Sequence, residues 1–309
     1  GYILAALVIA ALVMARRNLI NGRSDTKGAL KLVTFFVLTI FGTWSLVEVR
    51  LGTFNPGALF EQVVFGRLFA HGLTHGALFG LFYIALEPYV RRMWPETLVS
   101  WSRLLIGRST DPLVGRDVLV GMATLGLLTA LISWGRGPVY ALFDLNLPLA
   151  GAGLSGGLSG IRYATSNLVM VLESTIGQAM LFLVVLLVLR LVMRRNWAAF
   201  LVVGVIVGLM RLTDPFLPEG AVGVTVFETL ATLLLVGVLI VCLLKFGLLS
   251  VIGGLGMIAL MGNAVLTWDF QQWYAGSSLV TILAVFGVAG WAFYISLAGR
   301  SLFKDSVLD

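Results

Sequence analysis

The sequence predicts an all-α membrane protein: a bundle of about nine transmembrane helices with one short amphipathic helix at a membrane surface. Of its 309 residues, 59% are hydrophobic and only 12% are charged. The mean hydropathy is +1.00, which is more apolar surface than a soluble chain of this length can bury. Long apolar runs recur along the whole chain, and only helices satisfy their own backbone hydrogen bonds inside lipid.

Nine apolar segments are predicted to cross the membrane, within one integral domain over residues 1–309. They lie at roughly 1–15, 30–48, 67–87, 118–134, 165–193, 197–212, 221–244, 246–266 and 278–298. The first has only 15 residues before Arg16. At 1.5 Å per residue these span about 22 Å, which is short of the roughly 30 Å hydrocarbon core. We therefore expect that Gly1 lies inside a helix and that the sequence is the C-terminal part of a longer polypeptide.

The distribution of positive charge predicts the orientation of the bundle. If the first segment runs from outside to inside, sixteen of the 21 Lys and Arg residues fall in the inside connections and five fall at the outside. Short loops on the cytoplasmic side of a membrane are enriched in Lys and Arg. We therefore expect a multi-pass protein of a bacterial cytoplasmic (inner) membrane, with the first residue outside and the C-terminus in the cytoplasm.

One hydrophilic cytoplasmic loop, 88–117, is predicted to carry an amphipathic helix. An apolar face repeats at helical spacing through Trp94, Leu98, Trp101 and Leu105. Arginines accompany this face at Arg91, Arg92, Arg103, Arg108 and Arg116. We expect the helix to lie flat in the lipid interface, with Trp94 and Trp101 as anchors and the arginines at lipid headgroups. Asp111-Pro112 is expected to end it, and Asp117 to cap the following membrane helix.

The connection at 135–164 reads as an extracytoplasmic loop rich in Gly, Pro and Ser. Within it, residues 151–156 match the dinucleotide-binding pattern G-x-G-x-x-G. No strand is expected before this pattern, and flexible Gly/Ser connectors produce it by chance. We therefore predict no dinucleotide site here and no cofactor.

The two histidines, His71 and His75, are four residues apart and share one helix face. This spacing suits metal or pigment ligands, but the metalloprotease pattern H-E-x-x-H is not present. A polar patch packed inside the bundle is the preferred interpretation, because small Gly and Thr neighbours allow close helix packing. We predict no metal site, and these histidines are the only candidate cofactor ligands.

Four polar or charged residues are predicted at depth in the bilayer: Glu173, Gln178, Arg211 and Glu228. Charges in a bilayer are costly and usually face a partner or a cavity. Either acid can pair with Arg211 and hold the bundle together, and either can line an ion or proton path. Structural pairing is the preferred interpretation, because no chain of basic groups accompanies these acids.

Three phrases of the sequence resemble a known family. They are ARRNLINGRSDTKGA (15–29), YIALEPYVRRMWPETLVSWSRLLIGRSTDPLVGRDVLVG (83–121) and SLAGRSLFKDSVLD (296–309). Together they resemble the C-terminal membrane region of large bacterial serine/threonine protein kinases of the acidobacterial type. The resemblance implies a cytoplasmic kinase domain, then one membrane helix, an extracytoplasmic region and finally the helices seen here. The motifs of the kinase domain are not in this sequence, so no catalytic residues carry over.

The sequence contains no recognised catalytic motif. We therefore expect a membrane regulatory or sensory module linked to a serine/threonine kinase, without catalysis of its own. A permease or ion-coupled transporter subunit is one alternative, and a structural or pigment-holding subunit of a larger membrane complex is another. The expected partners are the lipid bilayer and either a kinase domain of the same polypeptide or another membrane subunit. Nucleic acid is not an expected partner.

Overall fold

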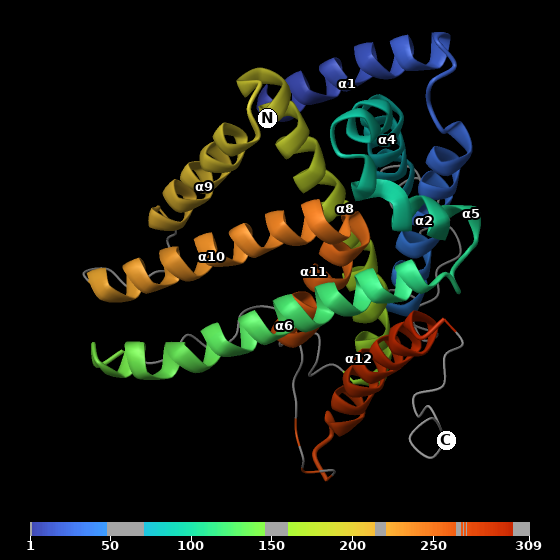
Figure 1. Ribbon diagram of the computed structural model, residues 1–309. Helices are drawn as coiled ribbons and strands as arrows, with labels where there is room; N and C mark the ends of the chain where they lie inside the picture. The colour runs from blue at the N-terminus through green and yellow to red at the C-terminus, as the bar shows by residue number, and fades with distance from the viewer. Residues whose placement is uncertain are drawn as a thin grey trace, which may run out of the picture.

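The computed structural model describes residues 2–47, 71–145, 160–213, 221–263 and 271–298, together with Thr267 and Asp269. This part of the chain is helical and contains no strand. The helices in chain order are α1 (Tyr2–Ile20), α2 (Thr26–Val47), α4 (Thr74–Met93), the 3₁₀ helix η2 (Pro95–Leu98), α5 (Val99–Ile106), α6 (Pro112–Ala141), α8 (Ile161–Met193), α9 (Asn196–Leu212), α10 (Val222–Phe246), α11 (Leu248–Asn263) and α12 (Ala275–Ser296). Figure 1 shows their arrangement.

The helical membrane class predicted from the sequence is confirmed. Each of the nine predicted segments overlaps one of these helices. Within the described residues, five helices are long and apolar enough to cross a membrane, namely α2, α6, α8, α10 and α12. Two shorter helices, α9 and α11, are also apolar. The number of spans, about nine, stays a prediction.

The bounds of α6 differ from those predicted. Asp111 is the N-cap residue, because its side chain accepts a hydrogen bond from the Leu113 amide at 3.0 Å, and Pro112 follows in the first turn. Asp at the N-cap followed by Pro is a start signal for a helix. The expectations that Asp111-Pro112 ends a helix and that Asp117 caps the next one are therefore wrong. The helix also continues to Ala141, so residues 135–141 are helical rather than part of a loop.

Close packing of α6 on α11 depends on glycine. A Cβ atom added to Gly121 would overlap the backbone carbonyl of Ser250, and one added to Gly253 would lie 2.8 Å from the Val118 carbonyl oxygen. Small residues let helix backbones approach closely in membranes, where van der Waals contact drives helix association. The α6–α11 contact is therefore fixed by backbone proximity.

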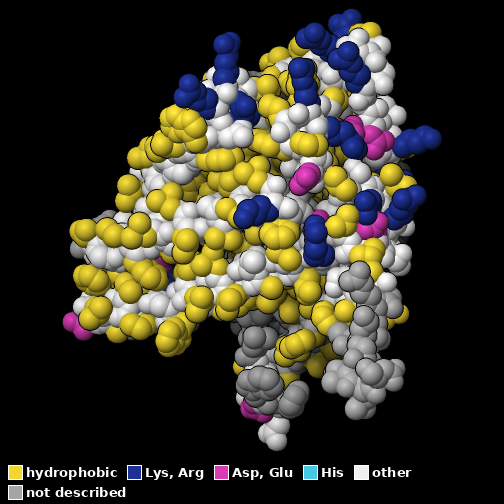
Figure 2. All heavy atoms as spheres, in the orientation of Figure 1, with side chains coloured by type: hydrophobic (Ala, Val, Ile, Leu, Met, Phe, Trp, Pro, Cys, Tyr) yellow, Lys and Arg dark blue, Asp and Glu magenta, His cyan; other side chains and the backbone are white. Residues whose placement is uncertain are grey.

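Polar and apolar surfaces are separated on the face in Figure 2. Lys and Arg side chains gather over its upper and right-hand parts, where Figure 1 places α1, α4, α5 and the α8–α9 turn. Large hydrophobic side chains remain exposed elsewhere, including Leu127 (64%), Trp134 (81%) and Phe286 (73%). A soluble monomer rarely exposes so much contiguous apolar surface. The structure thus supports a membrane-embedded protein.

Candidate functional site

The candidate site is the segment from Pro95 to Ile106, which consists of η2 and α5. It confirms the short helix predicted within 88–117. The helix ends at Gly107, whose φ of 94° is left-handed and whose amide donates to the Leu104 carbonyl oxygen at 2.9 Å. Glycine adopts this conformation without steric cost, so it stops the helix here.

The apolar face of this η2–α5 segment is covered by protein rather than by lipid. Trp94, Leu98 and Trp101 are only 8%, 2% and 3% exposed, and all three belong to the main hydrophobic core. The prediction that the two tryptophans anchor the segment in the lipid interface is therefore wrong. The large hydrophobic side chains of this segment that stay exposed are Val99 (38%) and Ile106 (70%).

Five helices contact the η2–α5 segment: α2, α4, α6, α10 and α11. Individual polar contacts connect it to α2 and to α4. The Lys31 ammonium of α2 donates to the Leu105 carbonyl oxygen, and Arg91 of α4 donates to the Ser102 hydroxyl at 2.9 Å. At the C-terminus of α10, Gly247 lies so close that a Cβ atom would come within 2.6 Å of the Thr97 carbonyl oxygen. Several helices of the bundle therefore pack around this segment.

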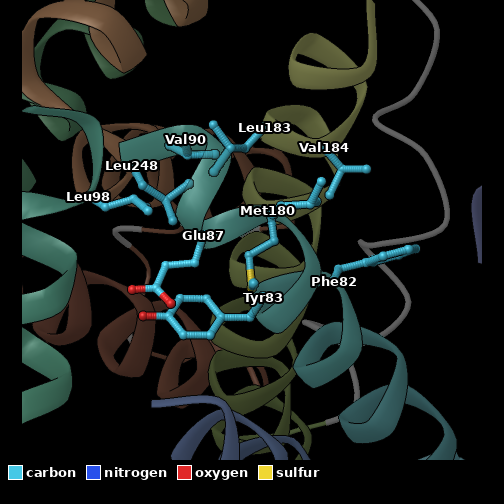
Figure 3. A pocket seen from close by; sticks show the side chains of 10 residues that line it. Phe82, Tyr83, Glu87, Val90, Leu98, Met180, Leu183, Val184 and Leu248 are labelled. Atoms are coloured by element: carbon cyan, nitrogen blue, oxygen red, sulfur yellow. The ribbon is translucent and has the colours of Figure 1, made fainter. Parts of the chain in front are cut away.

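A buried polar cluster supports the segment from the side of α4. The Glu87 side chain is 5% exposed and accepts hydrogen bonds from Arg91 Nε at 2.7 Å and from the Asp25 amide at 2.8 Å. The Tyr83 hydroxyl donates to Asp25 Oδ2 at 3.4 Å. Figure 3 shows the oxygens of Tyr83 and Glu87 close together beside Leu98 and other apolar side chains. The cluster links the turn before α2 to α4.

Arginine side chains also bond to acidic residues at the start of α6. Arg103 donates to both oxygens of Asp111, at 2.8 and 2.7 Å. Partial burial alone would raise the pKa of Asp111, but the hydrogen bonds from Arg103 and from the Leu113 amide hold that pKa below its usual value. Arg116 bonds to the buried Asp117 at 2.8 Å. The Arg103–Asp111 pair thus ties the segment to the N-cap of α6, whereas the Arg116–Asp117 bond lies within α6 itself. The predicted headgroup arginines Arg91, Arg92 and Arg108 remain exposed.

A second charged cluster lies far from this segment, between α6, α9 and α10. Glu228 is 2% exposed and accepts from Arg211 Nη2 at 3.0 Å, which confirms the predicted pairing of Arg211 with this acid. Arg136 also bonds to it, through Nε at 2.8 Å and Nη2 at 2.9 Å. Sequence reasoning missed Arg136, because it placed residue 136 in a loop. We call these three residues the Arg–Glu–Arg cluster.

Glu173 is not part of that cluster. It is half-buried on α8, and its electrostatic neighbours are His75 and His71. The other predicted polar residue, Gln178, is exposed on α8. His75 Nδ1 lies 2.9 Å from the His71 carbonyl oxygen, and the two rings are 6.2 Å apart. The described part of the chain holds no group of three metal-ligating side chains. Both histidines are exposed, so the preferred interpretation of a polar patch packed inside the bundle is wrong, and ligand binding by them stays the untested alternative.

Two sequence features lie outside the described residues: the glycine-rich stretch at 151–156 and the end of the chain from residue 299. Comparisons with protein-family models, with curated proteins and with solved structures find no match to this chain. The functional interpretation therefore rests on the geometry described above and on the resemblance noted from the sequence.

Proposed function

We propose that this chain is a membrane-embedded regulatory module that works with a serine/threonine kinase domain and carries out no catalysis itself. The observation that carries the proposal is the position of the η2–α5 segment, which contacts five helices on the side where Lys and Arg gather. A shift of any of these helices would move this one segment. Only the sequence resemblance supports the kinase domain. This domain would belong to the same polypeptide.

The bonds around the segment suit a switch. Lys31 to Leu105 and Arg91 to Ser102 are partly exposed polar contacts between different elements. Contacts between exposed charged and polar groups contribute only about 0–1 kcal/mol each. They can therefore exchange without unfolding the bundle, which is what a two-state element needs. The proposed module has about nine spans in a bacterial cytoplasmic membrane, with the arginine-bearing side and the C-terminus in the cytoplasm.

An ion-coupled transporter is less well supported. A transport path needs polar groups along a water-filled route. The large cavity between α5, α6, α8, α11 and α12 is lined by apolar residues apart from Thr175, and the residues of the Arg–Glu–Arg cluster pair with one another. The described geometry thus favours regulation over transport.

Native membranes provide the test. Intact mass of the natural polypeptide should reveal a kinase domain attached to this chain, and the membranes should incorporate phosphate from ATP into Ser or Thr. Lys31→Met, which removes the bond to Leu105, should change the phosphorylation rate severalfold. Lys27→Met is the matched control, because Lys27 is exposed on the same helix. A natural polypeptide without kinase activity, or equal rates in the two variants, would refute the proposal.

A further inference from the structure

A large apolar cavity lies between α5, α6, α8, α11 and α12. Its volume is about 430 Å³, within the range of roughly 300–1,000 Å³ that is common for small-molecule sites. The walls include Leu104 of α5, Val118 of α6, Ile176 of α8 and Met257 of α11. Among the residues that the structure describes, no charged residue lines it. The hydroxyl of the lining Thr175 already donates to the Leu172 carbonyl oxygen at 3.1 Å. Apolar cavities of this kind do not hold water well.

The cavity is elongated along the helices. Its lining runs along α11 from Leu249 to Leu260, a rise of about 16 Å at 1.5 Å per residue. One leaflet of a bilayer contributes half of the roughly 30 Å hydrocarbon core, or about 15 Å. The cavity therefore matches the length of hydrocarbon in one leaflet.

One end of the cavity is formed by elements that also carry arginines. Trp101 of α5 and Val114 at the start of α6 form this end. The same two elements and the turn between them carry three arginines, Arg103, Arg108 and Arg116, against the two acids Asp111 and Asp117. Arginines near a membrane surface attract anionic lipid headgroups. Asp111 and Asp117 pair with Arg103 and Arg116, so the exposed Arg108 supplies the excess positive charge beside this apolar channel.

We propose that this cavity holds one acyl chain of an anionic bilayer phospholipid, whose phosphate lies at the arginine-bearing end. The most exposed lining side chains belong to α8 and α12, where Leu172 is 47% exposed, Val288 42% and Trp291 40%. The chain would enter between these two helices directly from the surrounding lipid. The site does not depend on the kinase-linked function, although α5 forms one of its walls.

Trp101 provides a probe for occupancy. It lines the cavity but is only 3% exposed, so bulk lipid does not reach it. The whole chain is reconstituted in vesicles of phosphatidylglycerol with brominated acyl chains, which quench the emission of tryptophans at short range. The emission contributed by Trp101 is the difference between the wild type and Trp101→Phe. We expect this component to be quenched in brominated vesicles.

A glycine pair provides the matched variants. A Cβ atom at Gly256 meets nothing within 4 Å and would point into free space at the cavity wall. Gly256→Phe should fill the cavity and remove most of the quenching of Trp101. Gly287→Phe is the control, since Gly287 also has free space but does not line the cavity.

Three outcomes would overturn the proposal. One is an unquenched Trp101 component in the wild type, a measurement that does not depend on the folding of the cavity variants. Another is equal quenching in Gly256→Phe and Gly287→Phe. The third is quenching only after free brominated fatty acid is added to vesicles of unbrominated lipid, which would assign the site to a free fatty acid.

Discussion

Arg136 of α6 and Glu228 of α10 form a bidentate ion pair, although 92 residues separate them in the chain. Both oxygens of the carboxylate are used, and the Glu228 side chain is 2% exposed. Arg211 adds a third bond from α9. One acid thus holds together three helices at the apolar side of the bundle, and its removal takes a shared carboxylate away from two arginines.

We expect Glu228→Leu to destabilise the bundle by about 3–5 kcal/mol, because breaking a buried ion pair strands the remaining charge. Arg136→Met should cost less, since Arg211 still neutralises Glu228. The double variant should recover part of the loss, and the coupling free energy follows from the four-variant cycle. Denaturant unfolding in detergent micelles measures it. Equal costs for Glu228→Leu and for Glu96→Leu, which changes an exposed acid, would contradict the pairing.

Gly121→Ala should disrupt the contact between α6 and α11. The new Cβ atom would overlap the Ser250 carbonyl, and overpacking of this kind typically costs about 1–3 kcal/mol. Gly237→Ala is the control, because a Cβ atom there meets nothing within 4 Å and alanine favours a helix. The melting temperature in micelles should fall only for the first variant. If both variants melt alike, the close approach of the two helices is wrong.

Trp101→Ser should destabilise the whole bundle rather than only release the η2–α5 segment. Because Trp101 is 3% exposed, its loss should cost about 3–5 kcal/mol, as for other large-to-small changes in cores. Ile106→Ser on the same helix should be nearly neutral, since Ile106 is 70% exposed. Hydrogen exchange across α4, α6 and α11 distinguishes the two results. Increased exchange confined to residues 95–106 would instead support an interfacial helix.

The stability that comes from the Asp111 charge should be lost in acid. The folded-state pKa of Asp111 lies below the unfolded value of about 3.9, so this contribution is complete above that pH and disappears as pH falls through the folded pKa. Asp111→Asn keeps an N-cap acceptor but removes the charge. The stability difference between wild type and Asp111→Asn should therefore be constant near neutral pH and shrink in acid. A difference independent of pH down to the acid range would show that the Arg103 pair contributes nothing.

The proposed orientation can be tested by cysteine labelling in a Cys242→Ala background. Asn21 and Ser109 are exposed residues on the arginine-bearing side, and Asp144 is exposed beyond the far end of α6. In intact cells, an impermeant thiol reagent should label a cysteine at Asp144 but not one at Asn21 or Ser109. The opposite labelling pattern would reverse the topology.

The sequence by itself determined the class of protein and the positions of most helices. Apolar length and backbone hydrogen bonding are local properties, so the nine segments fall on helices and the short helix before α6 was found. The pairing of Arg211 with Glu228 could also be predicted from the sequence, because buried charges need partners and the apolar segments contain few charged residues. The pairing of Arg136 was not predicted, since α6 ends at Ala141, about two turns beyond the predicted end at residue 134.

Only the tertiary structure decided what covers each apolar face. Trp94, Leu98 and Trp101 have the same periodicity whether lipid or protein lies against them, because both environments are apolar and give the same transfer free energy. The approach of α4, α10 and α11 resolves this ambiguity, and it depends on residues distant in the chain, such as Gly247 beside Thr97. Helix formation is thus set by nearest neighbours in sequence, whereas burial in a membrane protein is set by which helices meet.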